Sequence, residues 1–270
     1  MQKMKYFIVT IITALALTSC SPYQKMLNKG TTEESYKMAT KLYEKGEYSK
    51  SITLFEKVIP FYTGKPQMER IQFMVAESNY KTKSYNLSGY YFSRFYDNYP
   101  KSSKREEALF LSAKGYYLAS PKYSLDQTDT RKALEVLQQF INSYPDSDKL
   151  KEANDIYKIL NTKIERKFFE ISKQNFKQEQ YSATIVSMAN FIEDFPGTKF
   201  KEEAFYYKFR AAYELGIKSI QNKKEERILE ALTIFTKFKK DFPKSEKLKE
   251  LEDSKNILDL QLKGLTNQTK

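Results

Sequence analysis

The chain has 270 residues, no His, no Trp and a single Cys. Imidazole bases, thiolate nucleophiles and the common zinc ligands are therefore missing, and with 8 Gly no phosphate-binding loop is found, so we expect neither an enzyme nor a metal centre. The 46 Lys and Arg and 34 Asp and Glu residues give a net charge of +12, but the two signs are interleaved as on solvated helix faces. The alternative is a weak attraction of the basic chain to lipid headgroups or to an acidic partner domain.

Residues 1–19 are predicted to be a cleaved export signal. Lys3 and Lys5 precede an apolar run of about 12 residues, which is too short to cross a bilayer. The run ends in Leu-Thr-Ser-Cys, with the cysteine at Cys20, and this ending resembles the lipobox of bacterial lipoproteins. We therefore expect a diacylglycerol and an N-acyl chain on Cys20, no other cofactor, and a lipidated tether over residues 20–32. The alternative is an ordinary signal peptide followed by an incidental cysteine.

A short pattern then recurs at intervals of 37 to 51 residues. Each copy has a small residue, a bulky apolar residue four positions later, another three positions after that and, in four of the copies, a proline five positions further on. Positions i, i+4 and i+7 share one face of a helix, so each copy predicts the buried stripe of a helix that the proline ends. The copies are Ser51, Phe55, Val58 and Thr63; Ser88, Phe92, Phe95 and Pro100; Ala133, Leu137, Phe140 and Pro145; Thr184, Met188, Phe191 and Pro196; and Ala231, Phe235, Phe238 and Pro243.

A second helix is predicted in each repeat. Ala39 and Ala76 stand twelve residues before the small residue of the first two copies, each inside another amphipathic segment. This arrangement resembles tetratricopeptide repeats, and the resemblance implies an all-α solenoid of five helix pairs and a C-terminal capping helix, eleven helices in total.

The expected solenoid covers residues 33–270, as a single domain that follows the tether. One long helix is expected within residues 149–178, and the long connection near residue 150 is a candidate boundary between three N-terminal and two C-terminal repeats. Residues 203–224 exceed one standard helix and leave the helix register of the fifth repeat open. The expected repeats are residues 33–63, 66–100, 103–145, 149–196 and 199–243, and the capping helix is residues 246–262.

Solenoids of this type bind peptides along a concave surface formed by the first helix of each pair. The helical face beside Ala39 and Ala76 is rich in tyrosine, whose rigid ring and hydroxyl suit an extended peptide with aromatic or hydrophobic ends. The alternative is that these side chains fill space between helices. The candidate substrate-peptide groove consists of Tyr36, Thr40, Tyr43, Phe73, Glu77, Tyr80 and Lys81.

Residues 115–130 are expected to form a loop in the third repeat, because Pro121 stands among Asp, Ser and Thr residues. Either Asp126 or Thr128 is a candidate N-cap for the helix that follows, and recognition of a partner is the alternative role. The motif residues of this loop are Ser120, Pro121, Tyr123, Asp126, Gln127 and Thr130.

The lipobox, the five repeats, this loop motif and the recurring Phe-Ile-x-x-Tyr/Phe-Pro phrases together resemble the BamD family of outer-membrane lipoproteins, with wording most similar to members from the Bacteroidetes. The resemblance implies a non-catalytic scaffold of the β-barrel assembly machinery, anchored by lipid to the periplasmic side of the outer membrane. It implies substrate recognition by the N-terminal repeats, and binding of the periplasmic repeats of a BamA-type barrel protein over residues 191–255. Unfolded outer-membrane proteins are the implied substrates, and export excludes nucleic acid as a partner.

A rival function is also open from the residues. Tetratricopeptide lipoproteins serve as scaffolds for cell-wall or polysaccharide enzymes in the envelope as well. Co-purification of a barrel protein with the chain would distinguish the assembly function from this rival.

Overall fold

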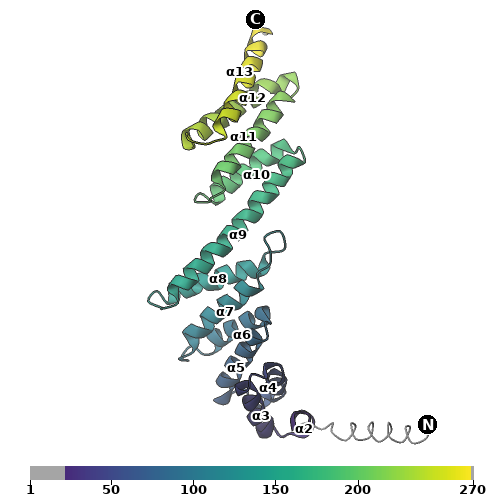
Figure 1. Cartoon of the computed structure of the whole chain (residues 1–270), viewed down its shortest axis with the longest axis vertical. Helices are drawn as coiled ribbons and strands as arrows, with labels where there is room; N and C mark the ends of the chain where they lie inside the picture. The colour runs from purple at the N-terminus through teal and green to yellow at the C-terminus, as the bar shows by residue number, and fades with distance from the viewer. Residues whose placement is uncertain (1–21, 269–270) are drawn as a thin grey trace, which may run out of the picture. The chain divides into compact units, whose positions relative to one another are not determined.

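The computed structural model describes residues 22–268, with side chains described as far as residue 265, so the predicted export signal and Cys20 lie outside the described residues. These residues contain twelve helices and no strand, which confirms the predicted all-α class (Figure 1). The helices are α2 (Pro22–Lys29), α3 (Thr32–Glu44), α4 (Tyr48–Tyr62), α5 (Gln67–Lys81), α6 (Tyr85–Asn98), α7 (Arg105–Ala119), α8 (Thr128–Ser143), α9 (Leu150–Lys177), α10 (Tyr181–Asp194), α11 (Lys201–Ile217), α12 (Gln221–Asp241) and α13 (Leu248–Gln268).

The helices form two compact units. Among the described residues, the N-terminal unit comprises 22–121 and 127–160, and the C-terminal unit comprises 122–126 and 161–268. The predicted long helix is α9, and it contributes to both units. The boundary lies at Leu160 rather than near residue 150, because Ala153, Ile156 and Leu160 of α9 belong to the core that α7 and α8 form.

The twelve-residue spacing within the first two repeats corresponds to a hydrogen bond between paired helices. Ser51 Oγ donates to the carbonyl oxygen of Ala39 at 2.8 Å, and Ser88 Oγ donates to that of Ala76 at 3.0 Å. All four residues are fully buried. A small side chain at both positions allows the helices to approach closely, and the carbonyl satisfies a hydroxyl that burial would otherwise leave unpaired.

The apolar residues of the pattern form the core, as predicted. Phe55, Phe92, Phe140, Phe191 and Phe238 are each at most 2% exposed. Burying one such ring contributes about 1.5–3 kcal/mol, so the five copies account for much of the stability of the repeats.

Proline ends the second helix of four repeats at the same position. The last residues of α6, α8, α10 and α12 each lie two positions before a proline, with one aromatic residue between them. Proline restricts the preceding residue to extended backbone and lacks an N–H group, so the helix cannot continue. In the first repeat Thr63 replaces that proline, and α4 continues to Tyr62 with Pro60 inside it.

Three of these prolines precede a hydroxyl group that binds a carboxylate on the first helix of the same repeat. The hydroxyl also accepts a hydrogen bond from the backbone N–H two residues later. The turn is therefore fixed both to itself and to a helix more than thirty residues earlier. The pairs are Ser147 with Glu106 at 2.6 Å, Thr198 with Glu165 at 2.9 Å, and Ser245 with Glu202 at 2.7 Å.

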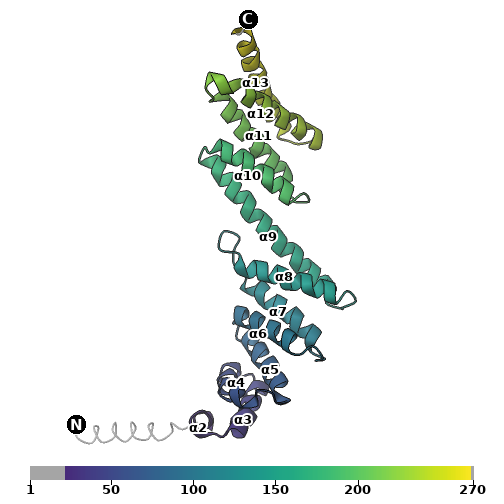
Figure 2. The same cartoon turned by 180° about the vertical axis from the view of Figure 1, so that it is seen from behind.

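Two glycines set the distance between α6 and α7, which lie side by side (Figures 1 and 2). A Cβ atom at Gly115 would lie 2.7 Å from the backbone nitrogen of Gly89 and 2.9 Å from the carbonyl oxygen of Tyr85. The buried Ser112 hydroxyl also donates to the Gly89 carbonyl at 2.7 Å. Glycine is required at residue 115 because two backbones meet there.

The two ends of the expected solenoid differ from the structure. The segment expected to be a tether contains α2, because Tyr23, Met26 and Leu27 pack against the buried apolar cluster that α3, α4 and α5 form. The capping helix extends beyond the expected residues 246–262. The helix α13 continues to Gln268, and Leu265 packs against the buried apolar cluster that α11, α12 and α13 share. The described helices number twelve rather than eleven because of α2.

The loop of the third repeat is shorter than residues 115–130. Gly115 is a buried residue of α7, and Thr130 is a fully buried residue of α8. The residue at the N-cap position is Gln127 rather than Asp126 or Thr128, and its side chain accepts no hydrogen bond from the helix backbone. In the fifth repeat, residues 203–224 are divided between two helices. The connection between α11 and α12 is Lys218–Ile220.

Candidate functional site

The predicted groove brings together side chains from the first helices of successive repeats. Tyr43 on α3 donates a short hydrogen bond to the carboxylate of Glu77 on α5, across 34 positions of the chain. Burial raises the pKa of Tyr43, and the bonded carboxylate raises it further because ionising the phenol would place two negative charges together. Tyr48 packs edge-on against Tyr43, with ring centroids 5.8 Å apart. The Tyr43–Glu77 pair therefore presents a neutral phenol beside a carboxylate.

A pocket of about 310 Å³ is lined by residues of α5, among them Phe73, which stands four residues before Glu77 on the same helix. The ring of Phe73 packs edge-on against Phe92 and Phe95, with centroids 5.4 and 5.2 Å away. The ammonium of Lys104, at the start of α7, lies 5.3 Å from the centre of the Phe73 ring. The pocket thus has two aromatic rings in its lining, together with the cations Arg70 and Lys104 and the carboxyl group of Glu69. Its lining residues are Pro66, Glu69, Arg70, Phe73, Met74, Phe95 and Lys104.

The cations of this pocket are held loosely. Lys104 pairs with Glu107 at 2.7 Å, and Arg70 lies 3.9 Å from Glu44; all four side chains are at least 41% exposed. Exposed ion pairs of this kind contribute at most about 1 kcal/mol each. Both cations are therefore able to bind an incoming carboxylate.

The structure places the remaining predicted groove residues in different surroundings. Tyr36 packs against Phe55 and Tyr62 within its own repeat, with centroids 6.3 and 5.2 Å away. The Thr40 hydroxyl is buried and has no hydrogen-bond partner among the described residues. Tyr80 packs edge-on against Tyr85, and Lys81 is exposed. Of the seven, Tyr43, Glu77 and Phe73 make contacts between repeats or line a pocket.

Sequence reasoning missed Arg70 and Lys104. Arg70 stands three residues before Phe73 and so shares its helical face, a signal that the sequence contained. Lys104 belongs to the next repeat, where only helix packing brings it over Phe73, and no spacing in the sequence indicates that contact.

The motif residues of the third repeat divide between the two units. In the N-terminal unit, the Ser120 and Thr130 hydroxyls lie 2.6 Å apart, and the Thr130 hydroxyl donates to the Gln127 side chain at 2.8 Å. In the C-terminal unit, the Arg166 guanidinium lies 4.2 Å from the Tyr123 ring centre. Pro121 is half-buried and the Asp126 side chain is exposed. These contacts order the loop and need no ligand.

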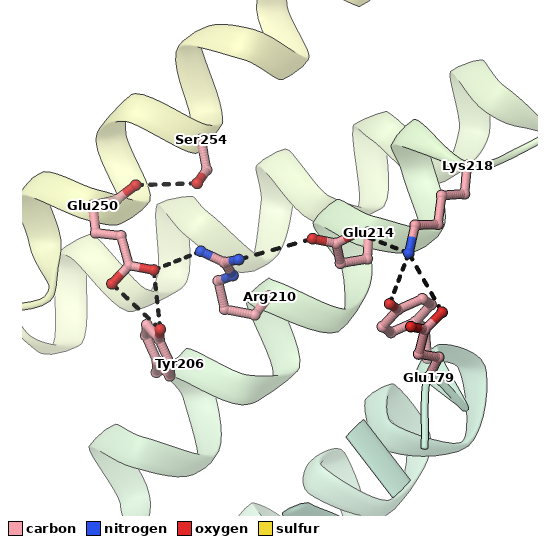
Figure 3. A network of polar contacts seen from close by, with 8 residues as sticks. Glu179, Tyr206, Arg210, Glu214, Lys218, Glu250 and Ser254 are labelled. Atoms are coloured by element: carbon pink, nitrogen blue, oxygen red, sulfur yellow. Dashed lines mark hydrogen bonds and ion pairs between the residues drawn. The ribbon is translucent and has the colours of Figure 1, made fainter. Parts of the chain in front are cut away.

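A polar network occupies part of the surface expected to bind a partner, residues 191–255. Arg210 on α11 binds Glu250 on α13 at 2.5 Å, and the Tyr206 hydroxyl donates to the same carboxylate at 3.0 Å (Figure 3). Burial and the bond to Glu250 raise the pKa of Tyr206. A hydrogen bond to the Tyr181 hydroxyl raises the pKa of Lys218, which also pairs with Glu214 at 3.3 Å. The network fixes α13 on α11.

Among residues 22–268, none of the helices combines the length and the apolar sequence that a membrane span requires. The same residues hold no group of three or more His, Cys, Asp or Glu side chains arranged to bind a metal.

Comparison with known proteins identifies the family. A profile of the YfiO family, described as outer membrane lipoprotein, matches residues 28–228. The chain belongs to this family. Most of α12 and all of α13 follow the matched residues.

Two relatives of the chain bear the BamD name. The outer membrane protein assembly factor BamD of Pasteurella multocida is 22% identical over 76% of this chain and 82% of its own length. A protein of Aquifex aeolicus, provisionally given the same name, is 26% identical over 80% of this chain and 71% of its own length. The family is thus one of outer-membrane assembly factors, as the resemblance indicated.

A solved structure with TPR-like repeats, from a provisionally assigned kinesin light chain of Podosopora anserina, is also similar. It is 11% identical, covers 76% of this chain and 95% of its own, and has a TM-score of 0.32. The fold assignment for the present chain rests on its own helix pairs.

Proposed function

We propose that the chain is a non-catalytic scaffold lipoprotein, acylated on Cys20, that receives unfolded outer-membrane proteins and binds a BamA-type barrel protein during their assembly. Family membership and the names of the relatives support the assembly role. The lipobox that ends at Cys20 supports the anchor, which would hold the protein on the periplasmic side of the outer membrane.

The pocket beside Phe73 is the observation that carries the substrate proposal. An aromatic side chain fits against Phe73, Met74 and Phe95, where edge-on ring contacts stabilise a bound ring. Arg70 and Lys104 in the lining supply charge-assisted hydrogen bonds to a carboxylate. A chain that ends in an aromatic residue offers both groups within one residue. The proposed ligand is therefore the C-terminal residue of an unfolded barrel protein.

The Tyr43–Glu77 pair would extend this site, since Glu77 stands one helical turn after Phe73 on α5. Its phenol is held neutral and its carboxylate accepts hydrogen bonds, so the pair suits the backbone N–H groups of an extended peptide. The aromatic pocket would then fix the end of the peptide, and the pair would orient the residues before it.

The proposed partner surface for the BamA-type protein lies in the C-terminal unit. The network of Tyr206, Arg210 and Glu250 fixes α11 and α13 as one rigid surface, and rigid surfaces bind with a smaller entropy loss. Attaching both proteins to one membrane would raise the effective concentration of a captured substrate near the barrel protein. No covalent step is needed.

Peptide binding tests the substrate site. Fluorescence anisotropy would compare a peptide ending in Phe with a free carboxylate and the same peptide with a C-terminal amide, using the mature chain with Cys20→Ala. We expect amidation, or the double change Arg70→Gln and Lys104→Gln, to weaken binding about tenfold, because each removes charge-assisted hydrogen bonds. Lys101→Gln, on an exposed lysine outside the pocket, is the control.

The outcome of amidation decides the ligand. Equal affinity of the two peptides in the wild type would contradict recognition of a chain end. In membranes solubilised with detergent, recovery of only cell-wall or polysaccharide enzymes with the acylated chain, and of no barrel protein, would favour the rival scaffold function.

A further inference from the structure

The segment after Cys20 is attached firmly to the first repeat. Lys57 on α4 donates from Nζ to the carbonyl oxygens of Met26 and Gly30, at 2.8 and 3.1 Å, where α2 ends. The buried Ser35 hydroxyl donates to the Met26 carbonyl as well, at 3.4 Å. A cation at a helix C-terminus satisfies the free carbonyls and complements the helix dipole.

Close packing also fixes the position of α2. A Cβ atom at Gly30 would lie 2.7 Å from the Met26 carbonyl oxygen and 3.0 Å from the Ser35 hydroxyl. The turn after α2 therefore leaves no room for a side chain at this position. Tyr23, Met26 and Leu27 of α2 pack on the core of the first two repeats. The helix thus moves together with α3 and α4 and is not a flexible linker.

The outward face of α2 is basic. Pro22, Lys25, Asn28 and Lys29 are exposed, and α2 contains no acidic residue. A hollow of about 590 Å³ adjoins this face, with both lysines at its rim and Met26 and Met38 among its apolar lining residues. Basic groups around an apolar hollow match the chemistry of phospholipid headgroups above acyl chains.

An acidic residue does lie near this face. Hydrogen bonds from the Thr31 backbone and hydroxyl lower the pKa of Glu34, on α3, and the nearby charge of Lys25 lowers it further. Glu34 is engaged in the capping box of α3, where it accepts from the Thr31 N–H and hydroxyl at 2.9 Å each. Its charge is thus directed at the helix start, and Lys25 and Lys29 remain the charged groups that α2 presents.

The length of chain before α2 limits what lies opposite this face. Ser21 alone separates Cys20 from Pro22, so the two Cα atoms lie at most about 7 Å apart. The headgroup layer of a bilayer is itself about 5–8 Å thick. If the proposed acylation places Cys20 at the membrane surface, α2 lies among or directly beneath the headgroups.

We propose that the outward face of α2 rests on the phospholipid headgroups and that Lys57 transmits this orientation to the first repeats. The occupant is a bilayer surface with anionic lipid phosphates. This inference rests on the proposed acylation of Cys20. The groove of the N-terminal unit is then held at a fixed angle to the membrane, close to where a barrel protein is inserted.

Fluorescence quenching tests the contact. Since Cys20 is the only cysteine and would be acylated, Asn28→Cys provides a single labelling site on the face, and Gln139→Cys on exposed α8 provides a matched distant site. The acylated proteins are placed in phosphatidylcholine vesicles with phosphatidylglycerol and nitroxide-bearing lipid. We expect quenching at residue 28 and none at residue 139.

Charge variants complete this test. Lys25→Gln with Lys29→Gln is expected to lower the quenching at residue 28, since each lysine near an anionic surface contributes about 1 kcal/mol, together about a thirtyfold change in the equilibrium between a face held on the headgroups and a face released from them. Lys101→Gln with Lys151→Gln removes the same charge from exposed positions of the same unit and is expected to have no effect. Unchanged quenching in the first double variant would overturn the inference.

Hydrogen exchange tests the attachment of α2. Its amides are expected to be protected in the wild type and to exchange about tenfold faster in Lys57→Met, which removes the charged hydrogen bonds. Unprotected amides in the wild type would show a flexible tether. If the protein is acylated but shows neither the quenching nor the protection, this inference alone is overturned. If the protein is recovered soluble and without acyl groups, the proposed anchor is overturned too.

Discussion

At the scale of single residues, several polar groups of this protein are paired over long separations in the chain. Tyr43 and Glu77, Ser147 and Glu106, and Thr198 with the buried Glu165 each join parts of the chain 33 to 41 positions apart. The Tyr43–Glu77 pair joins two successive repeats, and the other two pairs hold the turn of a repeat on its own first helix. Such pairs fix how helices are placed, because leaving one partner unsatisfied in a buried place costs about 1–3 kcal/mol.

The Tyr43–Glu77 pair predicts a pH dependence of stability. The folded-state pKa of Tyr43 is raised above its ordinary value of 10.0, so the bond contributes fully below pH 10 and is lost as the pH rises through the folded-state value. We expect Glu77→Gln to cost about 1 kcal/mol at pH 7 and progressively less above pH 10. Urea unfolding across this range measures the difference.

A matched variant controls for loss of negative charge. Glu56→Gln removes an exposed carboxylate from α4 and is expected to leave the free energy of unfolding unchanged at every pH. A difference between wild type and Glu77→Gln that stays constant above pH 10 would show that Tyr43 does not titrate with this bond.

At the scale of elements, the first repeat departs from the others and carries the predicted site. The proline that ends α6, α8, α10 and α12 is absent after α4, and the first pair is extended by α2. The next repeat adds the pocket beside Phe73. The candidate site thus spans the irregular first repeat and the regular second repeat.

The crossing of α6 and α7 predicts a large effect of one methyl group. Gly115→Ala gains about 1 kcal/mol of helix propensity, but its Cβ meets backbone atoms of α6 that cannot move aside without shifting the helix. Overpacking of this kind costs about 1–3 kcal/mol, so we expect a net loss of stability in urea unfolding. At Gly197 a Cβ meets nothing within 4 Å, and Gly197→Ala should change stability by less than about 0.5 kcal/mol. A more stable Gly115→Ala protein would refute the close approach.

At the scale of the whole molecule, the two units have separate cores. Phe92 and Phe209 are both fully buried, the first in the N-terminal unit and the second in the C-terminal unit. Repeat proteins are stabilised mainly by contacts between neighbouring repeats, so damage in one unit need not spread to the other.

Matched core variants should therefore unfold different parts of the chain. Phe92→Ala and Phe209→Ala each remove a ring from a filled core and are expected to cost about 3–5 kcal/mol in their own unit. Hydrogen exchange should show faster exchange in α5 for the first variant and in α12 for the second. Equal loss of protection in both units for either variant would show that the chain unfolds as one cooperative body.

The sequence alone determined the fold class, the repeated helix pattern and the core residues. It did so because helical periodicity, small residues at helix contacts and proline at helix ends are local properties that recur in the chain. The family followed from a resemblance in short motifs and not from this periodicity. The site was only partly predictable: Phe73 and Tyr43 follow from their helical faces, and Arg70 shares the face of Phe73.

Only the tertiary structure decided which side chains from different helices meet. Lys104 lies over Phe73 and Lys57 binds the end of α2 because of the angles and distances at which helices pack, which no local spacing encodes. The same reason explains the tether: Pro22–Lys29 is too short to be stable alone, and it is a helix because the first repeat offers Tyr23, Met26 and Leu27 a surface to pack on.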